Sequence, residues 1–261
     1  MVRIAVGVEY DGSAYAGWQV QSGLATVQQV TERALAQIAA QPVSLTCAGR
    51  TDTGVHACGQ VAHFDTDSLR SMRSWVLGTN SELPSDVSVS WARVVPAHFH
   101  ARFSAEARTY RYLIVNRLAR PALLASRAAW VHRPLDHERM EQAAQGLVGE
   151  HDFSAFRAAG CQARSPVRRL ERITVERCGE RILIEVTANA FLHHMMRNIA
   201  GLLISIGKGQ APVEWAREVL AGRDRSVNAA TAPAAGLYLL SVRYPQAFAL
   251  PAPAPREVFA A

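Results

Sequence analysis

Strand-like and helix-like segments alternate along both halves of this sequence. Apolar residues occupy every second position from Ile4 to Tyr10, which is the period of a β-strand. A loop rich in glycine and serine follows. Thr26, with Gln29 three residues later, is then typical of the start of a helix, which must end before Pro42. The pattern therefore predicts a strand, a loop and a helix in this order.

The remaining sequence continues in the same way, so that each half mixes strands with two or more helices. Further strands are predicted at 45–47, 61–64, 87–95, 108–115, 169–177, 181–187 and 237–242, and further helices at 68–77, 138–147, 192–206 and 213–220. This combination predicts an α+β fold. We expect two related βαββαβ-type halves whose sheets join into one largely antiparallel sheet, with helices packed on it.

The expected boundary between the halves lies near residue 100. Residues 1–100 are predicted to form the first half and residues 101–245 the second. Residues 246–261 are rich in alanine and proline, a composition typical of a tail without chemistry of its own.

A basic excess favours an anionic partner. The 261 residues include 28 Lys and Arg against 22 Asp and Glu, which gives a net charge of +6 and a pI near 9.5. The same excess also serves solubility, so charge alone leaves both interpretations open. Apolar residues make up 49% of the chain, which excludes a disordered protein.

The sequence indicates neither a disulfide framework, nor a zinc ribbon, nor a membrane anchor. Its four cysteines lie far apart without a C-x-x-C pair. The longest apolar run, at 199–206, is too short to span a bilayer, and the sequence starts without a basic and apolar leader. We therefore expect a cytoplasmic protein with reduced thiols.

The most specific segment is GRTDTGVHA at residues 49–57, in which Asp52 stands among small residues, an arginine and two glycines. Aspartate and glycine are frequent in turns, so composition alone favours a structural turn. The complete string, however, closely resembles the catalytic loop of the TruA family of tRNA pseudouridine synthases. In that family the aspartate of this loop is the essential residue.

The resemblance follows the family's order along most of the chain. The further matching segments are residues 10–12, 17–19, 108–112, 153–156, 161–162, 165–168, 191–198 and 233–237. The departures are small, because only Ala163 and Met196 stand where serine and valine are common. The tail lies outside the resemblance.

The resemblance implies an isomerase that needs neither cofactor nor metal. Family members break the C–N glycosidic bond of a uridine, turn the bound uracil and form a C–C bond from the same ribose carbon. They act at positions 38, 39 and 40 of the tRNA anticodon stem-loop and are homodimers, with the catalytic cleft between the two halves. No added group is required, which agrees with a sequence that has no phosphate-binding glycine loop.

The resemblance also implies roles for single residues. Asp52 would be catalytic, and Arg197 would pair with it and keep it ionised. Tyr110 would stack on the extruded uracil, and Leu237 would close the pocket beneath it. Arg50 would fill the space that the base leaves and hold phosphate. A carboxylate can attack the sugar or remove a ribose proton, and both roles of Asp52 stay open.

Each of these residues also has an ordinary interpretation. Arg197 lies opposite the apolar stripe of the predicted helix 192–206, beside the small Gly201, where a solvated arginine is common. Tyr110 and Leu237 fall on predicted strands, where core packing is the usual role.

Basic and histidine side chains in the second half are candidates for contacts with RNA. The local cluster comprises Arg157, Arg164, Arg168, Arg169 and Arg172. We expect Arg164 and Arg168 to contact phosphate, although a solvated surface is the alternative for each. His193 is expected to face the RNA. It diverges from His194 by about 100° on a helix, so the pair indicates no metal site.

Two other functions compete with this hypothesis. A hydrolytic N-glycosidase would use similar carboxylate chemistry but release free uracil, and the motif carries no second catalytic acid beside Asp52. A non-catalytic RNA-binding protein of the same fold would not need Asp52, Arg197 and Tyr110 together.

Overall fold

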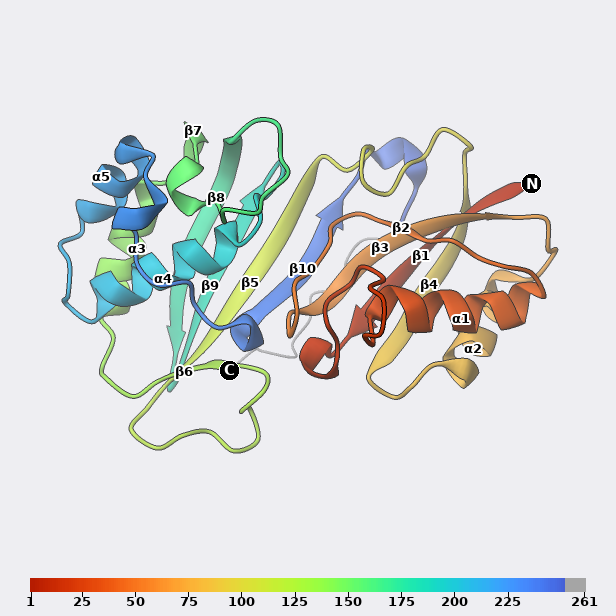
Figure 1. Cartoon of the computed structure of the whole chain (residues 1–261), viewed down its shortest axis with the longest axis horizontal. Coiled ribbons are helices and arrows are strands. Elements are labelled where there is room, and N and C mark those ends of the chain that lie inside the picture. Colours follow the sequence, from red (N-terminus) through yellow and green to blue (C-terminus); the bar gives the residue numbers. More distant parts are fainter. Residues whose placement is uncertain (252–261) are drawn as a thin grey trace. The chain divides into compact units, whose positions relative to one another are not determined.

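The computed structural model describes residues 1–251 of the chain. They divide into two compact units, one made of residues 1–106 with 238–251 and the other of residues 107–237 (Figure 1). The first unit therefore contains segments from both ends of the described chain. The predicted tail starts with a short 3-10 turn, Gln246–Phe248, and its residues 252–261 lie outside the described part.

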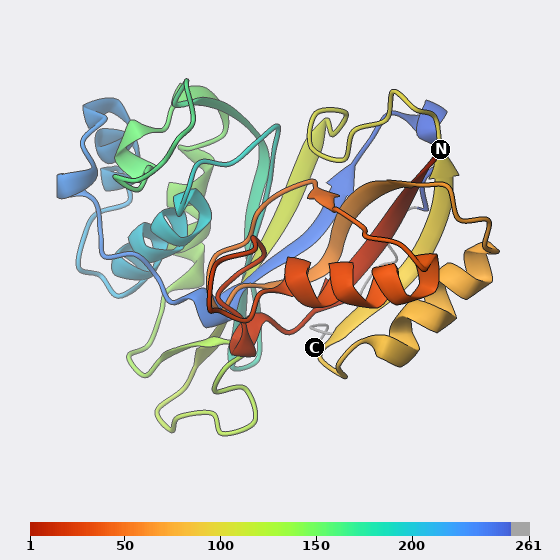
Figure 2. The same cartoon turned by 45° about the vertical axis from the view of Figure 1, so that its right-hand side comes forward.

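The first unit is a sheet with two helices on one face. Its elements are β1 (Val2–Tyr10), α1 (Val27–Ala39), β2 (Thr46–Cys47), β3 (His56–Thr66), α2 (Met72–Glu82), β4 (Val87–Val95) and, from Tyr238 onward, β10 (Leu237–Arg243). The strand order is β4-β1-β3-β10, and β2 also pairs with β3. β1 is antiparallel to both neighbours, whereas β10 is parallel to β3. The helices α1 and α2 lie side by side (Figure 2).

The central strand β1 is buried on both faces. The alternation of the sequence predicts one buried face, but every residue from Ile4 to Val8 is buried. The second face carries Ala5 and Gly7, and the indole of Trp91 on β4 covers Gly7 so closely that a Cβ there would lie 2.1 Å from the indole Nε1. A pattern based on large apolar residues therefore does not reveal the second buried face, because small residues form it.

The second unit has the same kind of architecture. Its elements are β5 (Ala107–Asn116), β6 (Ala129–Val131), α3 (His137–Gln145), β7 (Gly149–Asp152), β8 (Val167–Cys178), β9 (Arg181–Ala188), α4 (Met195–Gly207) and α5 (Trp215–Gly222). The order β5-β9-β8-β7 is antiparallel throughout, and β6 pairs in parallel with β5. The helices α3, α4 and α5 pack together, with α3 also on β8 (Figure 1).

These elements confirm the predicted fold class. The fold is α+β, with a mostly antiparallel sheet and helices packed on it. Setting aside the short strands β6 and β7, which the sequence pattern misses, the order β-α-β-β-α occurs as β1-α1-β2-β3-α2 and again as β5-α3-β8-β9-α4. None of the helices within residues 1–251 combines the length and apolar character that crossing a membrane requires.

Several element boundaries differ from the prediction because local capping decides them. α2 begins at Met72 and not at residue 68, since Ser71 is its N-cap and accepts a hydrogen bond from the Ser74 amide at 3.0 Å. α4 begins at Met195 and not at residue 192, because His194 adopts the left-handed conformation with φ 62°.

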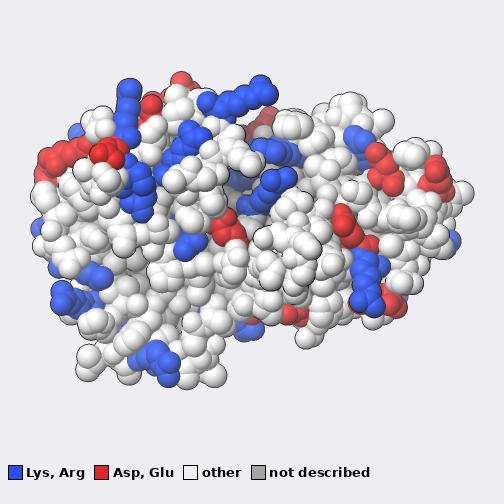
Figure 3. Space-filling model, in the orientation of Figure 1, with Lys and Arg blue, Asp and Glu red and all other residues white. Residues whose placement is uncertain are grey.

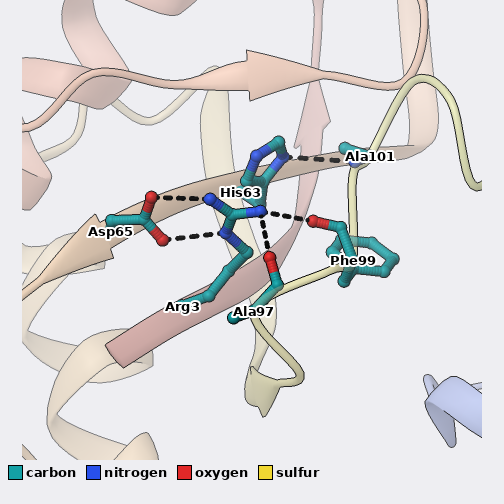
Figure 4. A network of polar contacts seen from close by, with 6 residues as sticks. All are labelled: Arg3, His63, Asp65, Ala97, Phe99 and Ala101. Atoms are coloured by element: carbon teal, nitrogen blue, oxygen red, sulfur yellow. Dashed lines mark hydrogen bonds and ion pairs between the residues drawn. The ribbon is translucent and has the colours of Figure 1, made fainter. Parts of the chain in front are cut away.

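A polar network in the first unit fixes the segment that follows β4 (Figure 4). The guanidinium of Arg3 donates to both carboxylate oxygens of Asp65, at 2.8 and 2.7 Å, and to the carbonyls of Ala97 and Phe99, at 2.6 and 2.8 Å. His63 Nδ1 accepts the amide proton of Ala101 at 3.2 Å. This acceptor role requires an unprotonated Nδ1.

Protonation of His63 is expected to weaken the fold. Burial, assisted by the charge of Arg3 and by His100, lowers the pKa of His63 from 6.5 to about 4. Because the folded pKa lies below the unfolded one, the unfolded chain binds the proton first as the pH falls. Stability is therefore present above pH 6.5 and is lost as the pH falls from there toward about 4.

Urea unfolding at a series of pH values measures this dependence. His63→Gln, which keeps an acceptor but no titrating ring, should lose less free energy of unfolding between pH 6.5 and 4 than the parent chain. Equal losses in the two proteins would contradict the assignment.

Candidate active site

Asp52 lies in a loop between β2 and β3 of the first unit, and its side chain is half-buried. The start of this loop is fixed by the buried Gln60, whose amide donates to the Gly49 carbonyl at 2.6 Å and accepts from the Gly49 amide at 3.4 Å. Its end is a turn in which the Val55 amide donates to the Asp52 carbonyl at 3.1 Å. Asp52 is therefore presented by a braced backbone.

The segment between β1 and α1 supports the middle of the Asp52 loop. The Thr51 carbonyl accepts the amide proton of Trp18 at 3.0 Å, and the Gly54 amide donates to the Tyr15 carbonyl at 3.3 Å. The hydroxyl of Tyr10 and Oγ1 of Thr51 are 2.7 Å apart. Backbone and side-chain contacts thus hold the residue before Asp52 from one side.

Two glycines make this close contact possible. At Gly17, φ is 94° and a Cβ would lie 2.6 Å from the Thr51 oxygen and 3.1 Å from the Asp52 carbonyl carbon. At Gly12, a Cβ would lie 2.0 Å from the Val55 oxygen. Gly12 belongs to the segment YDG (residues 10–12) and Gly17 to the segment GWQ (residues 17–19), both of which the sequence singles out. Because neither glycine carries a side chain, the loop between β1 and α1 can lie directly against the Asp52 loop.

Arg50 is exposed on the same loop. It therefore lies in the same unit as Asp52, two residues earlier in the chain. The other residues predicted for the site all belong to the second unit: Tyr110, Arg164, Arg168, His193, Arg197 and Leu237.

Arg197 is held at the start of α4 by the segment that precedes β10. Its Nε donates to the Ala232 carbonyl at 2.8 Å, and its own carbonyl accepts the Ala232 amide proton at 3.1 Å. One turn later, a Cβ at Gly201 would lie 2.1 Å from the Ala230 oxygen. The space beside Gly201 is filled by this chain's own residue 230.

Asn198 links this segment to the rest of the second unit. Its side-chain amide donates to the Phe156 carbonyl at 2.7 Å, and its oxygen accepts from Thr231 at 2.7 Å and from Arg225 at 3.1 Å. Asn198, the neighbour of Arg197 in the chain, is buried, and these hydrogen bonds satisfy its polar atoms. The sequence segment 191–198 contains Asn198, but only its contacts reveal this positioning role.

Tyr110 and Leu237 are both buried, at 8% and 5% exposure. The ring of Tyr110 meets that of Phe191 edge-on, with centroids 4.7 Å apart. Leu237 follows Gly236, where a Cβ would lie 2.7 Å from the Leu113 oxygen. The burial of Tyr110 and Leu237 therefore agrees with a role in core packing, whether or not they also have a function.

The predicted phosphate contacts differ in their surroundings. Arg164 is exposed and has no hydrogen-bond partner among the described residues. Arg168 is half-buried, and its Nη1 donates to the carbonyls of Ser165 and Val167 at 2.9 and 2.6 Å. Arg164 is therefore the better placed of the two to bind an anion.

His193 is exposed and marks the entry to α4. Its amide donates to Cys161 Sγ at 3.4 Å, and its carbonyl accepts from the Ala158 amide at 3.0 Å. Partial burial opposes ionisation of Cys161, but the amides of Ala163 and His193, with Arg157, lower the pKa of its thiol. The loop 157–163 is thereby tied to the start of α4.

The basic excess lies in the second unit. Residues 107–237 include 19 Lys and Arg against 12 Asp and Glu, whereas acidic residues slightly outnumber basic ones in the described part of the first unit. On the face drawn in Figure 3, basic side chains occur with acidic ones among them. The second unit therefore has the charge that a polyanionic substrate requires.

Sequence comparison identifies the class of protein that these features define. The profile of a family described as tRNA pseudouridine synthase matches residues 6–104 and 143–245. The chain belongs to this family, and it is therefore an isomerase that acts on tRNA. The matched ranges contain Asp52 and Arg197, while Tyr110 falls between them.

Curated relatives narrow this class. The chain is 57% identical over 250 residues to tRNA pseudouridine synthase A of Pseudomonas aeruginosa, covering 95% of this chain and 88% of the relative. It is 57% identical to the protein of the same name from Methylococcus capsulatus over 249 residues, covering 95% and 92%. It is 55% identical to tRNA pseudouridine synthase A of Coxiella burnetii over 251 residues, which cover 96% of each chain.

The contact between Gly17 and the Asp52 loop can be tested against a matched glycine. Gly23 also has a positive φ, 75°, but a Cβ there would meet nothing within 4 Å. Both Gly17→Ala and Gly23→Ala incur the conformational cost of about 1–2 kcal/mol for a left-handed residue. Only Gly17→Ala must also displace the Thr51 carbonyl, at a further cost of about 1–3 kcal/mol.

We expect Gly17→Ala to be the less stable variant in urea unfolding and to form pseudouridine more slowly per folded molecule. Equal activity of the two variants would show that the position of the Asp52 loop does not depend on this contact.

Proposed function

We propose that this chain isomerises uridine to pseudouridine at positions 38, 39 and 40 of the tRNA anticodon stem-loop, with Asp52 as the catalytic residue. The observation that carries the proposal is the Asp52 loop. A carboxylate is presented there, half-buried, on a backbone that Gln60, Trp18 and Tyr15 hold by hydrogen bonds. A braced carboxylate in a member of this family is suited to act on a sugar carbon.

Two balanced routes are open to such a carboxylate. In one, an oxygen of Asp52 bonds to C1′ as the C1′–N1 bond breaks. The uracil then turns, its C5 displaces the carboxylate from C1′, and C5 loses its proton while N1, which left as an anion, takes one up. In the other, Asp52 removes the C2′ proton as N1 leaves as an anion, C5 then bonds to C1′, and the proton returns to C2′. C5 again loses its own proton and N1 takes one up. Both routes need the ionised carboxylate.

The second unit is proposed to supply the remaining functions. Arg197 favours the ionised form of the catalytic carboxylate in the complex with tRNA, and Tyr110 stacks on the uracil, which Leu237 bounds. The anchorage of Arg197 to the Ala232 carbonyl supports a fixed position for its guanidinium.

Other residues are proposed to bind the RNA backbone. Arg50 occupies the space left by the flipped base and binds phosphate, and Arg164, Arg168 and His193 contact RNA. Exposure of Arg50, Arg164 and His193 supports this assignment, while the carbonyl contacts of Arg168 leave it fewer donors for phosphate. A cytoplasmic location and a homodimer are part of the same proposal, since tRNA is the substrate and the family resemblance implies the dimer.

Asp52→Asn tests the catalytic assignment. The amide has the size of the carboxylate but can neither attack C1′ nor take up a proton, so pseudouridine formation should fall by ~10³-fold or more while the Kd for tRNA stays within about two-fold. Pseudouridine is mapped by chemical derivatisation of an unmodified transcript.

Asp67→Asn, at an exposed carboxylate of the first unit, is the matched control and should keep full activity. Normal product from Asp52→Asn would refute the role of Asp52, and free uracil released by the parent chain would identify an N-glycosidase instead.

Arg197 and Arg164 are expected to separate catalysis from binding. Arg197→Ala should lower kcat far more than it raises Kd, because its partner is the catalytic carboxylate. Arg164→Ala should instead raise Kd and reduce the salt dependence of binding by about one ion, with kcat little changed. Single-turnover rates and salt titrations measure both effects. Equal losses of kcat and affinity in Arg197→Ala would assign Arg197 to phosphate binding.

A further inference from the structure

A turn between β4 and β5 presents an aromatic ring to solvent in the first unit. It consists of residues 100–103, here named the 100–103 tip. The amides of Arg102 and Phe103 both donate to Nδ1 of His100, each at 3.2 Å, and the Ser104 amide donates to the His100 carbonyl at 2.9 Å. The turn therefore has a defined backbone conformation.

The base of the 100–103 tip is fastened to the body of the first unit. The Ala101 amide donates to His63, and the Ala101 carbonyl accepts from the Tyr244 hydroxyl at 2.5 Å. The preceding carbonyls of Ala97 and Phe99 are held by Arg3 (Figure 4). A surface turn with this many anchors loses little freedom when it binds a partner.

The exposed part of the tip combines an aromatic surface with positive charge. Phe103 is 76% exposed. Its ring stacks on the His100 ring, with centroids 4.3 Å apart and 29° between the planes. The Arg102 guanidinium carbon lies 5.6 Å from the Phe103 centroid. The exposed ring and the adjacent guanidinium together offer a flat π-surface and a positive charge, a combination that suits a ligand with a flat π-surface and negative charge.

The tip lies beside β2, the strand that leads into the Asp52 loop. β2 pairs Thr46 with His63, the residue that holds Ala101, and the Asp52 loop leaves β2 directly after Cys47. Burial raises the pKa of the Cys47 thiol to about 12, and the charges of Arg50 and Arg102 both oppose that rise. An arginine from the Asp52 loop and an arginine from the tip thus both act electrostatically on Cys47.

We propose that the 100–103 tip is a second RNA contact of the first unit, in which Phe103 stacks on an unpaired base of the tRNA and Arg102 binds an adjacent phosphate. The proposal rests on the proposed function. It names a substrate-binding element outside the catalytic and phosphate-binding residues given above. Stacking on an aromatic ring suits any unpaired base, because every base has a π-face. The tip therefore adds affinity for RNA without reading sequence.

Equilibrium binding of unmodified tRNA transcript tests the stacking contact. Phe103→Ala should raise Kd by about 5- to 150-fold, the range for loss of one base stacked on an aromatic residue. Phe103→Tyr, which keeps the ring, should stay within about two-fold of the parent. Leu69→Ala is the matched control, since Leu69 is an equally exposed apolar residue of the same unit, at 86%.

The charge contact has a different signature. Arg102→Gln should reduce the slope of log Kd against log salt by about one, whereas Phe103→Ala should leave that slope unchanged. Melting temperatures equal to the parent's confirm that the exposed Phe103→Ala variant is folded.

Two outcomes would overturn the proposal. One is a Kd for Phe103→Ala equal to that of the parent. The other is a change of oligomeric state in light scattering on Phe103→Ala, because the ring would then be a contact with a second copy of this chain. Absence of pseudouridine from the parent chain would instead refute the proposed function, and the comparison of binding constants remains a separate measurement.

Discussion

The carbonyl of Thr51 is the point on which the presentation of Asp52 depends. It accepts the Trp18 amide proton and lies where a side chain at Gly17 would stand. A carboxylate with the role proposed for Asp52, action at a particular sugar carbon, needs its own backbone fixed to within a fraction of an ångström. In this protein the loop between β1 and α1 provides much of that constraint, together with Gln60 on β3 and Tyr10 on β1. The segments YDG and GWQ, at residues 10–12 and 17–19, thus let the neighbouring loop lie against the Asp52 loop.

The second unit follows the same principle with different parts. Arg197 is held between α4 and a strip of backbone at residues 230–232, which the absence of a side chain at Gly201 allows to approach. Asn198 then ties the strip to the turn at Phe156. Both units thus position a charged side chain by pressing an irregular segment against a glycine. Such an arrangement is rigid without being regular, and secondary-structure patterns do not reveal it.

The sequence predicts the strands and helices well where one face is apolar or a cap is explicit. β4, β8 and β9 follow from period two, and α1 from the cap at Thr26. The sequence pattern does not reveal burial where small residues form the second face of a strand, as at Gly7 on β1. It also places the start of α4 too early, because His194 adopts a left-handed conformation and the helix begins only after it. The candidate site residues came from motif resemblance. Contacts that hold them, at Gln60 and Asn198, have no signal in composition or period because an amide side chain fits many environments.

The parallel pairing of β10 with β3 has a consequence for the order in which the molecule is completed. Tyr238 and Leu239 pair with His56 and Ala57, which directly follow the Asp52 loop. During synthesis the ribosome makes the Asp52 motif early, but β10, which pairs with the residues that follow it, emerges only after the whole second unit has been translated. In a nascent or prematurely ended chain, β3, which follows the aspartate loop, therefore lacks its pairing with β10. The sheet of the first unit can therefore be completed only after β10 has been synthesised, long after the Asp52 motif.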